Sequence, residues 1–204
     1  MKENVSPSAW ILKHRQSLLV LRRQYILVTD RLIAASPRLQ EVESIAANLE
    51  EPHFIYYVPP SLGKLRVFPL HVKLLKTHEW LPLYPVKVFR FNSETHVTEQ
   101  ALIDSGADIS CVPYQLGADL GLQQHPQEVP LSIAGVGGET DYLQRELKME
   151  LAGTLLQVPM AWIQDQDELE FIIGRAEVFE RFDITFRQSQ ETIEFVAVQS
   201  PHKK

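Results

Sequence analysis

An acid, a hydroxyl and a glycine follow an apolar stretch near the middle of the chain. The run Ala101-Leu102-Ile103 has the pattern of a buried strand end, and Asp104-Ser105-Gly106 comes next without a spacer. An ionised carboxylate is costly to bury alone, so Asp104 needs either a partner or a chemical use. Gly106 allows the backbone to turn sharply and to approach another chain or a ligand closely. An Asp-Ser-Gly turn after a strand is also common structural chemistry, so this stretch alone leaves a plain turn and a reactive loop equally open.

The composition is that of an ordinary globular protein. The 204 residues are 45% hydrophobic and 23% charged, which suits one large domain or a compact domain with an appendage. A net charge of −6 argues against a general nucleic-acid binder. Residues 1–38 hold seven Lys or Arg against two acids, a balance of +5 that leaves −11 for residues 39–204. We therefore expect the N-terminal segment to be a separate unit with its own surface.

The single cysteine, Cys111, excludes an internal disulfide and a cysteine metal cluster. It favours a reducing compartment. The first residues have no signal-peptide pattern, and charged pairs interrupt the apolar runs well before membrane-spanning length. We expect a cytoplasmic protein without a membrane partner, a metal or a cofactor.

Residues 1–51 carry helix signals. Ser6-Pro7 is a typical helix start, and apolar residues recur at spacings of three and four from Ile11 to Leu32. Ser36-Pro37 then precedes a second amphipathic stretch over 39–49. These patterns predict an α-helical hairpin, followed by a connecting β/loop segment over 52–82. The basic residues of the first helix could contact nucleic acid, but no aromatic or glycine-rich recognition element is interleaved with them, so we favour a solvated face.

Residues 83–200 have the alternation of a β domain. Stretch 85–91 pairs naturally with 97–103, and 182–186 with 192–198, as two hairpins. Between them, 131–134 and 142–151 flank a glycine-rich tip formed by Gly135, Val136, Gly137 and Gly138. A phosphate-binding glycine loop would need a helix next, whereas residues 142–151 alternate like a strand. The tip is thus predicted to belong to a projecting hairpin.

Two separated stretches resemble one family. Residues 102–108, Leu-Ile-Asp-Ser-Gly-Ala-Asp, resemble the active-site loop of the retroviral-type, or retropepsin-like, aspartic proteases. Residues 171–175, Phe-Ile-Ile-Gly-Arg, resemble the apolar segment that lies beside this loop in the family, and the glycine-tipped hairpin stands where the family has its flap. The resemblance covers roughly residues 83–198. It implies a mainly β fold with a closed barrel, to which the helical hairpin would be an N-terminal extension.

The resemblance also implies an activity and a partner. The chain contains one Asp-Ser-Gly motif, so a site with two aspartates requires a homodimer. Asp104 would be the catalytic residue, and the two carboxylates would share a proton and activate a water for hydrolysis of a peptide or protein substrate.

Further roles follow from the same resemblance. Ser105, Gly106 and Ala107 would complete the active-site loop, and Ile173 and Gly174 would support it. Asp108 and the flap residues Gly135, Val136, Gly137 and Gly138 would bind substrate. Arg175 is the natural partner of Asp108, which predicts an ion pair within each protomer. Ala107 lacks the hydroxyl that pepsin-like enzymes place there to bond the aspartate, so we expect activity at less acidic pH than theirs.

Two alternatives remain open at this point. The chain could be a catalytically silent dimerisation or peptide-binding module, because a fold does not fix a function. The first 80 residues could pack on the barrel domain, extend the dimer or cover the cleft as an inhibitory segment, and we favour the first two.

Overall fold

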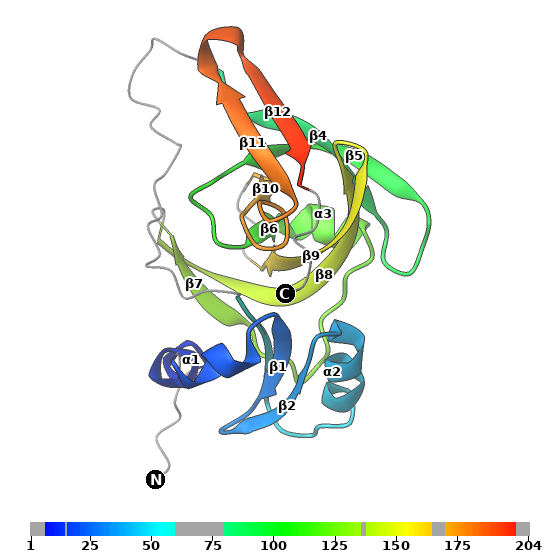
Figure 1. Ribbon diagram of the computed structural model, residues 1–204. Coiled ribbons are helices and arrows are strands. Elements are labelled where there is room, and N and C mark those ends of the chain that lie inside the picture. The colour runs from blue at the N-terminus through cyan, green and yellow to red at the C-terminus, as the bar shows by residue number, and fades with distance from the viewer. Residues whose placement is uncertain (1–6, 15, 60–79, 136–137, 165–169, 199–204) are drawn as a thin grey trace.

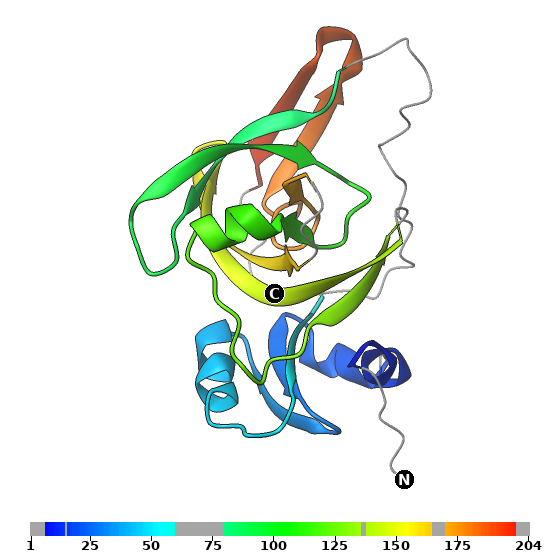
Figure 2. The same ribbon diagram turned by 180° about the vertical axis from the view of Figure 1, so that it is seen from behind.

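The computed structural model describes residues 7–14, 16–59, 80–135, 138–164 and 170–198. Its described part has an N-terminal unit, a β-barrel and a C-terminal hairpin (Figure 1). The barrel lies in the middle, the N-terminal unit packs against its β7–β8 side, and the C-terminal hairpin stands at the opposite end in both views (Figures 1 and 2).

The N-terminal unit, defined as the described residues from 7 to 58, combines a small sheet with helices on its sides. The sheet has the order β2-β1-β3, and both pairings are antiparallel. Its elements are α1 (Pro7–His14), the 3-10 turn η1 (Ser17–Leu21), β1 (Gln24–Val28), β2 (Leu32–Ser36), α2 (Leu39–Ala46) and β3 (Phe54–Val58).

The predicted helical hairpin is wrong in its first arm. The second helix is confirmed as α2, but the first ends at His14, and residues 24–28 and 32–36 are strands. The cause is the apolar run from Tyr25 to Val28, which is buried on both faces of the sheet. A continuous apolar run satisfies helical and strand spacing alike, and only length and neighbours separate them. Strand β3, predicted within the connecting segment, pairs with β1 and so belongs to the N-terminal sheet.

The barrel follows from the alternation of residues 83–173. Its elements are β4 (Leu83–Phe89), β5 (His96–Ile103), β6 (Ser110–Val112), α3 (Tyr114–Asp119), β7 (Leu131–Gly135), β8 (Gly138–Leu151), β9 (Thr154–Ile163) and β10 (Ile172–Ile173). They form a seven-stranded sheet in the order β4-β5-β10-β6-β9-β8-β7, and an additional β4–β8 pairing closes all but β7 into a ring. The predicted closed barrel is thus confirmed.

The barrel core is apolar and continuous. Alternate side chains of the hairpin β4–β5, such as Val86, Val88, Ala101 and Ile103, point inward and are fully buried. The long hairpin β8–β9 turns at Ala152 and Gly153, whose φ angles of 47° and 76° match a tight two-residue turn. The end of β5 is set by its pairing with β4 and β10, which also places Asp104.

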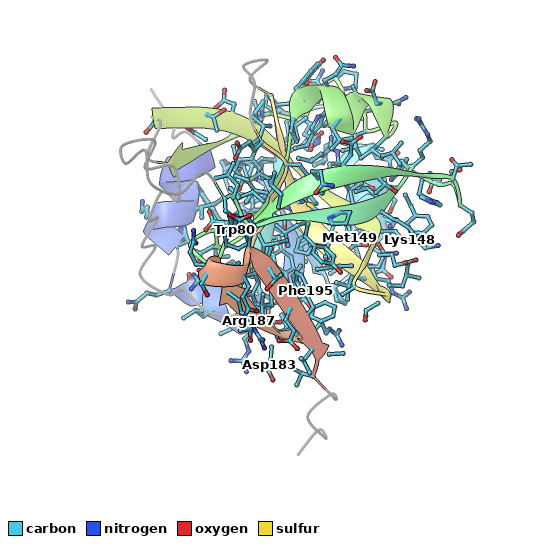
Figure 3. All side chains as sticks on the ribbon, turned by 90° about the horizontal axis from the view of Figure 1, so that it is seen from above. Trp80, Lys148, Met149, Asp183, Arg187 and Phe195 are labelled. Carbon is cyan, nitrogen blue, oxygen red and sulfur yellow. The ribbon has the colours of Figure 1, made fainter. Side chains whose placement is uncertain are left out.

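The C-terminal hairpin is a separate two-stranded sheet. It consists of β11 (Phe182–Arg187), the 3-10 turn η2 (Gln188–Gln190) and β12 (Thr192–Ala197). The ring of Phe195 (Figure 3) contacts that of Tyr84 on β4 at a centroid distance of 4.6 Å, which holds the hairpin to the barrel. Within the hairpin, Phe195 also contacts Phe182, at 5.6 Å, and Phe182 is buried in the barrel core. This confirms the predicted terminal hairpin.

The N-terminal unit packs on the barrel, as one of the alternatives for this segment predicted. One face of its sheet shares an apolar cluster with β7, β8 and β9, formed by Leu18, Ile26, Val28, Phe54, Val58, Leu131, Tyr142, Ala161 and Ile163. The other face joins a cluster that includes Ala176. Arg23 adds ion pairs to Glu177 and Glu180, which agrees with a basic segment on an acidic domain. No helix in the described ranges is both long and apolar enough to span a membrane.

Candidate active site

Asp104 stands at the carboxyl end of β5. The three residues before it are buried, and Asp104 itself is partly exposed. Its backbone N–H donates to the carbonyl oxygen of Ile173 at 2.9 Å, and its Oδ1 accepts the N–H of Gly106 at 2.7 Å. A hydrogen bond from a backbone N–H fixes the direction of the carboxylate. The loop thus presents a partly exposed carboxylate, one oxygen of which is fixed by a hydrogen bond from the Gly106 N–H.

Strand β10 threads between β5 and β6 beside this loop. Ile172 and Ile173 run parallel to the end of β5, and Ile172 also pairs antiparallel with Cys111 of β6. Gly174 follows, and a Cβ there would lie 2.6 Å from the backbone carbonyl carbon and oxygen of Ile109. No larger residue fits without moving the loop, so Gly174 permits the close approach of the two segments.

The predicted Asp108–Arg175 ion pair is confirmed. Backbone hydrogen bonds accompany it, because the N–H of Arg175 donates to Ala107 at 2.9 Å and that of Ala176 to Asp108 at 3.0 Å. The side chains of Asp108 and Arg175 are 32% and 47% exposed. A pair this exposed contributes little to stability, so its value is to hold the geometry of the loop.

The structure brings most of the predicted site residues together. Hydrogen bonds and the ion pair connect six of them into one set, which comprises Asp104, Gly106, Ala107, Asp108, Ile173 and Arg175. In the predicted flap, Gly135 and Gly138 pair with each other at the end of the hairpin β7–β8. Val136 and Gly137, predicted as its tip, lie outside the described residues.

Sequence reasoning missed Ser110. This residue is fully buried in β6, and its Oγ accepts the N–H of Gly174 at 3.0 Å. It therefore ties residues 171–175 to β6, the strand that follows the Asp104 loop. The available signal was a single hydroxyl within the apolar run from Ile109 to Val112, because a buried hydroxyl needs a partner.

Comparison with known proteins agrees with this geometry. A family model described as aspartyl protease matches residues 87–176, a segment that holds the Asp104 loop, the glycine hairpin and Gly174 with Arg175. This segment is similar to the aspartyl proteases. The family and the barrel support aspartic protease activity in general, which is hydrolysis of peptide bonds.

One solved structure is similar to about half of this chain. The EIAV protease complexed with the inhibitor HBY-793 is 20% identical over 50% of this chain and 88% of its own, with a TM-score of 0.37. No functionally curated sequence gives a significant match.

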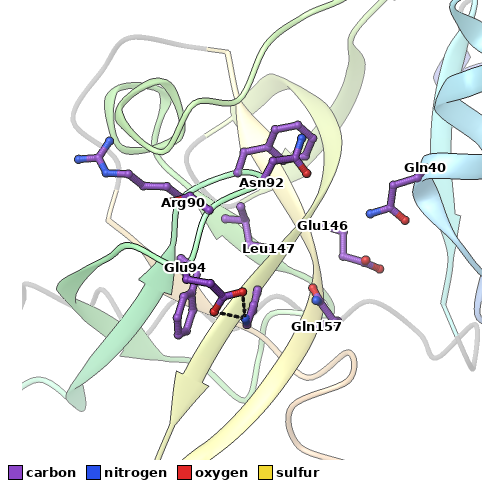
Figure 4. A pocket seen from close by; sticks show the side chains of 11 residues that line it. Gln40, Arg90, Asn92, Glu94, Glu146, Leu147 and Gln157 are labelled. Carbon is purple, nitrogen blue, oxygen red and sulfur yellow. Dashed lines mark hydrogen bonds and ion pairs between the residues drawn. The ribbon is translucent and has the colours of Figure 1, made fainter.

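Two cavities lie away from Asp104. One, of about 250 Å³, lies between Gln40 of α2 and residues of β4, β8 and β9 (Figure 4). The other, of about 530 Å³, lies between α2 and the segment from Gly121 to Glu128. Neither has Asp104 in its lining.

Cys111 lies near Asp104 but is poorly suited to be a nucleophile. Burial raises the pKa of its thiol to about 12, and the charge of Asp104 adds to this rise. The thiolate is the reactive form of cysteine, so a thiol with this pKa stays inert at neutral pH. Within the described part of the loop, Asp104 is therefore the better candidate for the chemistry.

Proposed function

We propose that the chain acts as a homodimeric aspartic endopeptidase in which each protomer supplies one Asp104. The observation that carries the proposal is the partly exposed Asp104 carboxylate, which accepts the N–H of Gly106 and follows a strand paired in parallel with β10. The chain has one such motif, and a two-fold axis would bring a second carboxylate opposite the first.

The chemistry follows from that pairing. Two carboxylates at close range do not both ionise, so the pair would hold one proton. The ionised Asp104 would take a proton from a water as the water attacks the peptide carbonyl carbon. The protonated Asp104 would donate to the carbonyl oxygen and stabilise the tetrahedral intermediate. Asp108 would hold the substrate backbone, and the hairpin β7–β8 would close over it.

A surface for the second protomer is available at the end of the barrel that carries the C-terminal hairpin. The carbonyl oxygen of Pro82 accepts the N–H of Ile103, which places the start of β4 beside Asp104. Exposed apolar side chains lie on or directly beside β4 and the C-terminal hairpin, and they comprise Leu81, Leu83, Phe186, Val196 and Val198. Among the described strands none pairs with the outer edges of β11 and β12. Unpaired edges with apolar side chains favour association, which supports this end as the dimer surface.

The decisive variant is Asp104→Asn. It removes the acid and base but keeps the shape of the side chain, so we expect cleavage of a peptide library to be lost while the circular dichroism spectrum is unchanged. Asp119→Asn, at the exposed end of α3, is the matched control and should keep full cleavage. Cleavage that survives in Asp104→Asn contradicts the assignment.

Protein concentration separates the protease from a silent module of the same fold. For the protease, cleavage per chain should rise with concentration until dimers predominate, and an aspartic-protease inhibitor should abolish it. A silent module would dimerise over the same range and cleave nothing.

A further inference from the structure

The N-terminal unit touches both chain segments that leave the Asp108–Arg175 ion pair. After Asp108, the partly buried Ile109 and Cys111 pack on the apolar cluster shared with the N-terminal sheet. After Arg175, Ala176 is buried in the cluster on the other face of that sheet. These contacts lie next to the proposed active site and were not predicted from the sequence.

Glu177 is the polar centre of this contact. Its Oε1 accepts a hydrogen bond from the hydroxyl of Tyr57 in β3 and one from Arg23, both at 2.8 Å. Burial and the bond to Glu177 raise the pKa of Tyr57, so its hydroxyl remains a donor at any physiological pH. The backbone N–H of Ala176, one residue earlier, donates to the backbone carbonyl oxygen of Asp108. A short path therefore connects the N-terminal unit to the ion pair.

The backbone at both partners is unusual. Arg23 and Glu177 have φ angles of 62° and 61°, a region that residues other than glycine rarely adopt. The other described non-glycine residues with positive φ, which are Asn92, Ala152 and Glu191, all lie in hairpin turns. Arg23 and Glu177 lie outside such turns and are ion-paired with each other. Strained residues persist where the surrounding contacts hold them, and they gather at functional sites.

We propose that Tyr57 and Arg23 are positioning residues of the protease: through Glu177 they hold the Asp108–Arg175 pair at the edge of the substrate site. This inference rests on the proposed function. It makes the N-terminal unit a working part of the enzyme and not an inhibitory cover.

The same sheet provides a matched control. The hydroxyl of Tyr25 donates to Glu146 at 2.8 Å, and its ring packs on that of Tyr57 at 5.1 Å. Tyr25→Phe and Tyr57→Phe therefore delete the same kind of buried tyrosine–glutamate bond from neighbouring strands. Glu146 lies on β8, whereas Glu177 lies on the segment that follows the ion pair.

The first readout is kinetic, on the full chain. We expect Tyr57→Phe to lower kcat/KM by at least about fivefold, mostly through a higher KM, because a displaced Asp108 weakens substrate binding. Arg23→Gln should act in the same direction, while Tyr25→Phe and Arg22→Gln, an exposed neighbour, should stay within about twofold of the unchanged chain. Equal losses of kcat/KM in Tyr25→Phe and Tyr57→Phe would show that the contact only supports the fold. A higher kcat/KM in Tyr57→Phe would show that the N-terminal unit inhibits the enzyme.

The second readout needs no cleavage. In the Asp104→Asn background, hydrogen exchange of peptides covering 104–112 and 170–182 should become faster with Tyr57→Phe and not with Tyr25→Phe. This measurement tests the coupling even if the unchanged chain cleaves nothing, so failure of the inference and failure of the proposed function are distinguishable. Equal exchange in the two variants overturns the coupling.

Discussion

The two ends of the barrel differ in what covers them, and we call the end under the N-terminal unit the covered end and the end with the C-terminal hairpin the open end. At one end the N-terminal unit buries apolar side chains against β7, β8 and β9 and adds tyrosine–glutamate bonds across the seam. At the other end Leu83, Val196 and their neighbours stay exposed on β4 and the C-terminal hairpin. The first surface is complete within one chain, whereas the second has the features of a surface that another chain covers. Changes at the first end should therefore alter the stability of the protomer, and changes at the second should alter self-association.

The largest effect is expected at the covered end, from Arg145→Met. Arg145 forms a two-pronged ion pair with Glu128 at 2.8 Å, and the two side chains are only 5% and 4% exposed. Removing one partner leaves a buried charge without compensation, which should lower the free energy of unfolding by about 3–5 kcal/mol. Urea unfolding followed by circular dichroism would measure it.

Lys148→Met is the control for that change, because it lies on the same strand. Lys148 pairs with Glu94, whose side chain is 85% exposed (Figure 4). An exposed pair of this kind should cost less than about 1 kcal/mol. Similar losses from both substitutions would show that the buried Arg145–Glu128 pair contributes no more to stability than an exposed pair.

A smaller effect on folding, but a large one on association, is expected from Leu83→Asp at the open end. A charge on an apolar contact surface should weaken dimerisation at least about tenfold, because its desolvation is not compensated. Analytical ultracentrifugation would detect the shift, and cleavage at low concentration should fall with it. Leu155→Asp, an exposed leucine on β9, should leave association unchanged. An unaltered dimer in Leu83→Asp would place the second protomer elsewhere.

The smallest effect concerns pH at the covered end. Burial raises the pKa of Glu43, Arg145 opposes the rise, and Glu128 and Glu146 add to it. A carboxyl whose pKa rises on folding favours the folded state below its ordinary pKa, and this contribution is lost as pH rises through the raised value. Ionised Glu43 therefore reduces stability near neutral pH.

Glu43→Gln should then raise Tm by a few degrees at about pH 7 and change it little at about pH 4. Glu50→Gln, an exposed position in the same unit, is the control and should change Tm at neither pH. Scanning calorimetry at the two pH values would measure it. An equal rise in Tm from Glu43→Gln at both pH values would show that the charge of Glu43 is not the cause.

The features that could be predicted from the sequence are local, and those that could not be predicted join residues far apart in the chain. Strand β4 alternates apolar and polar residues, and polar or glycine-containing turns separate β4 from β5 and β8 from β9, so these hairpins can be predicted from local sequence. The Asp108–Arg175 pair followed from the family resemblance. The contact of Tyr57 with Glu177 joins residues 120 positions apart, and no local pattern encodes it. The β4–β8 closure is equally non-local.

The wrong prediction of a long first helix in the N-terminal unit has a related cause. Residues 25–28 are apolar on both faces of β1 because each face packs on a different cluster. Such a strand loses the alternation that would identify it. Gln24 to Val28 is short and rich in residues that favour strands, which was the available signal.

The central claim is that one active site needs an Asp104 from each of two chains. Mixing the unchanged chain with Asp104→Asn at constant total concentration, after subunit exchange, tests it most directly. The account predicts that cleavage falls with the square of the unchanged fraction, to about one quarter in an equal mixture, because mixed dimers are inactive. A linear fall, to about one half, would mean that each chain cleaves by itself and would contradict the shared site.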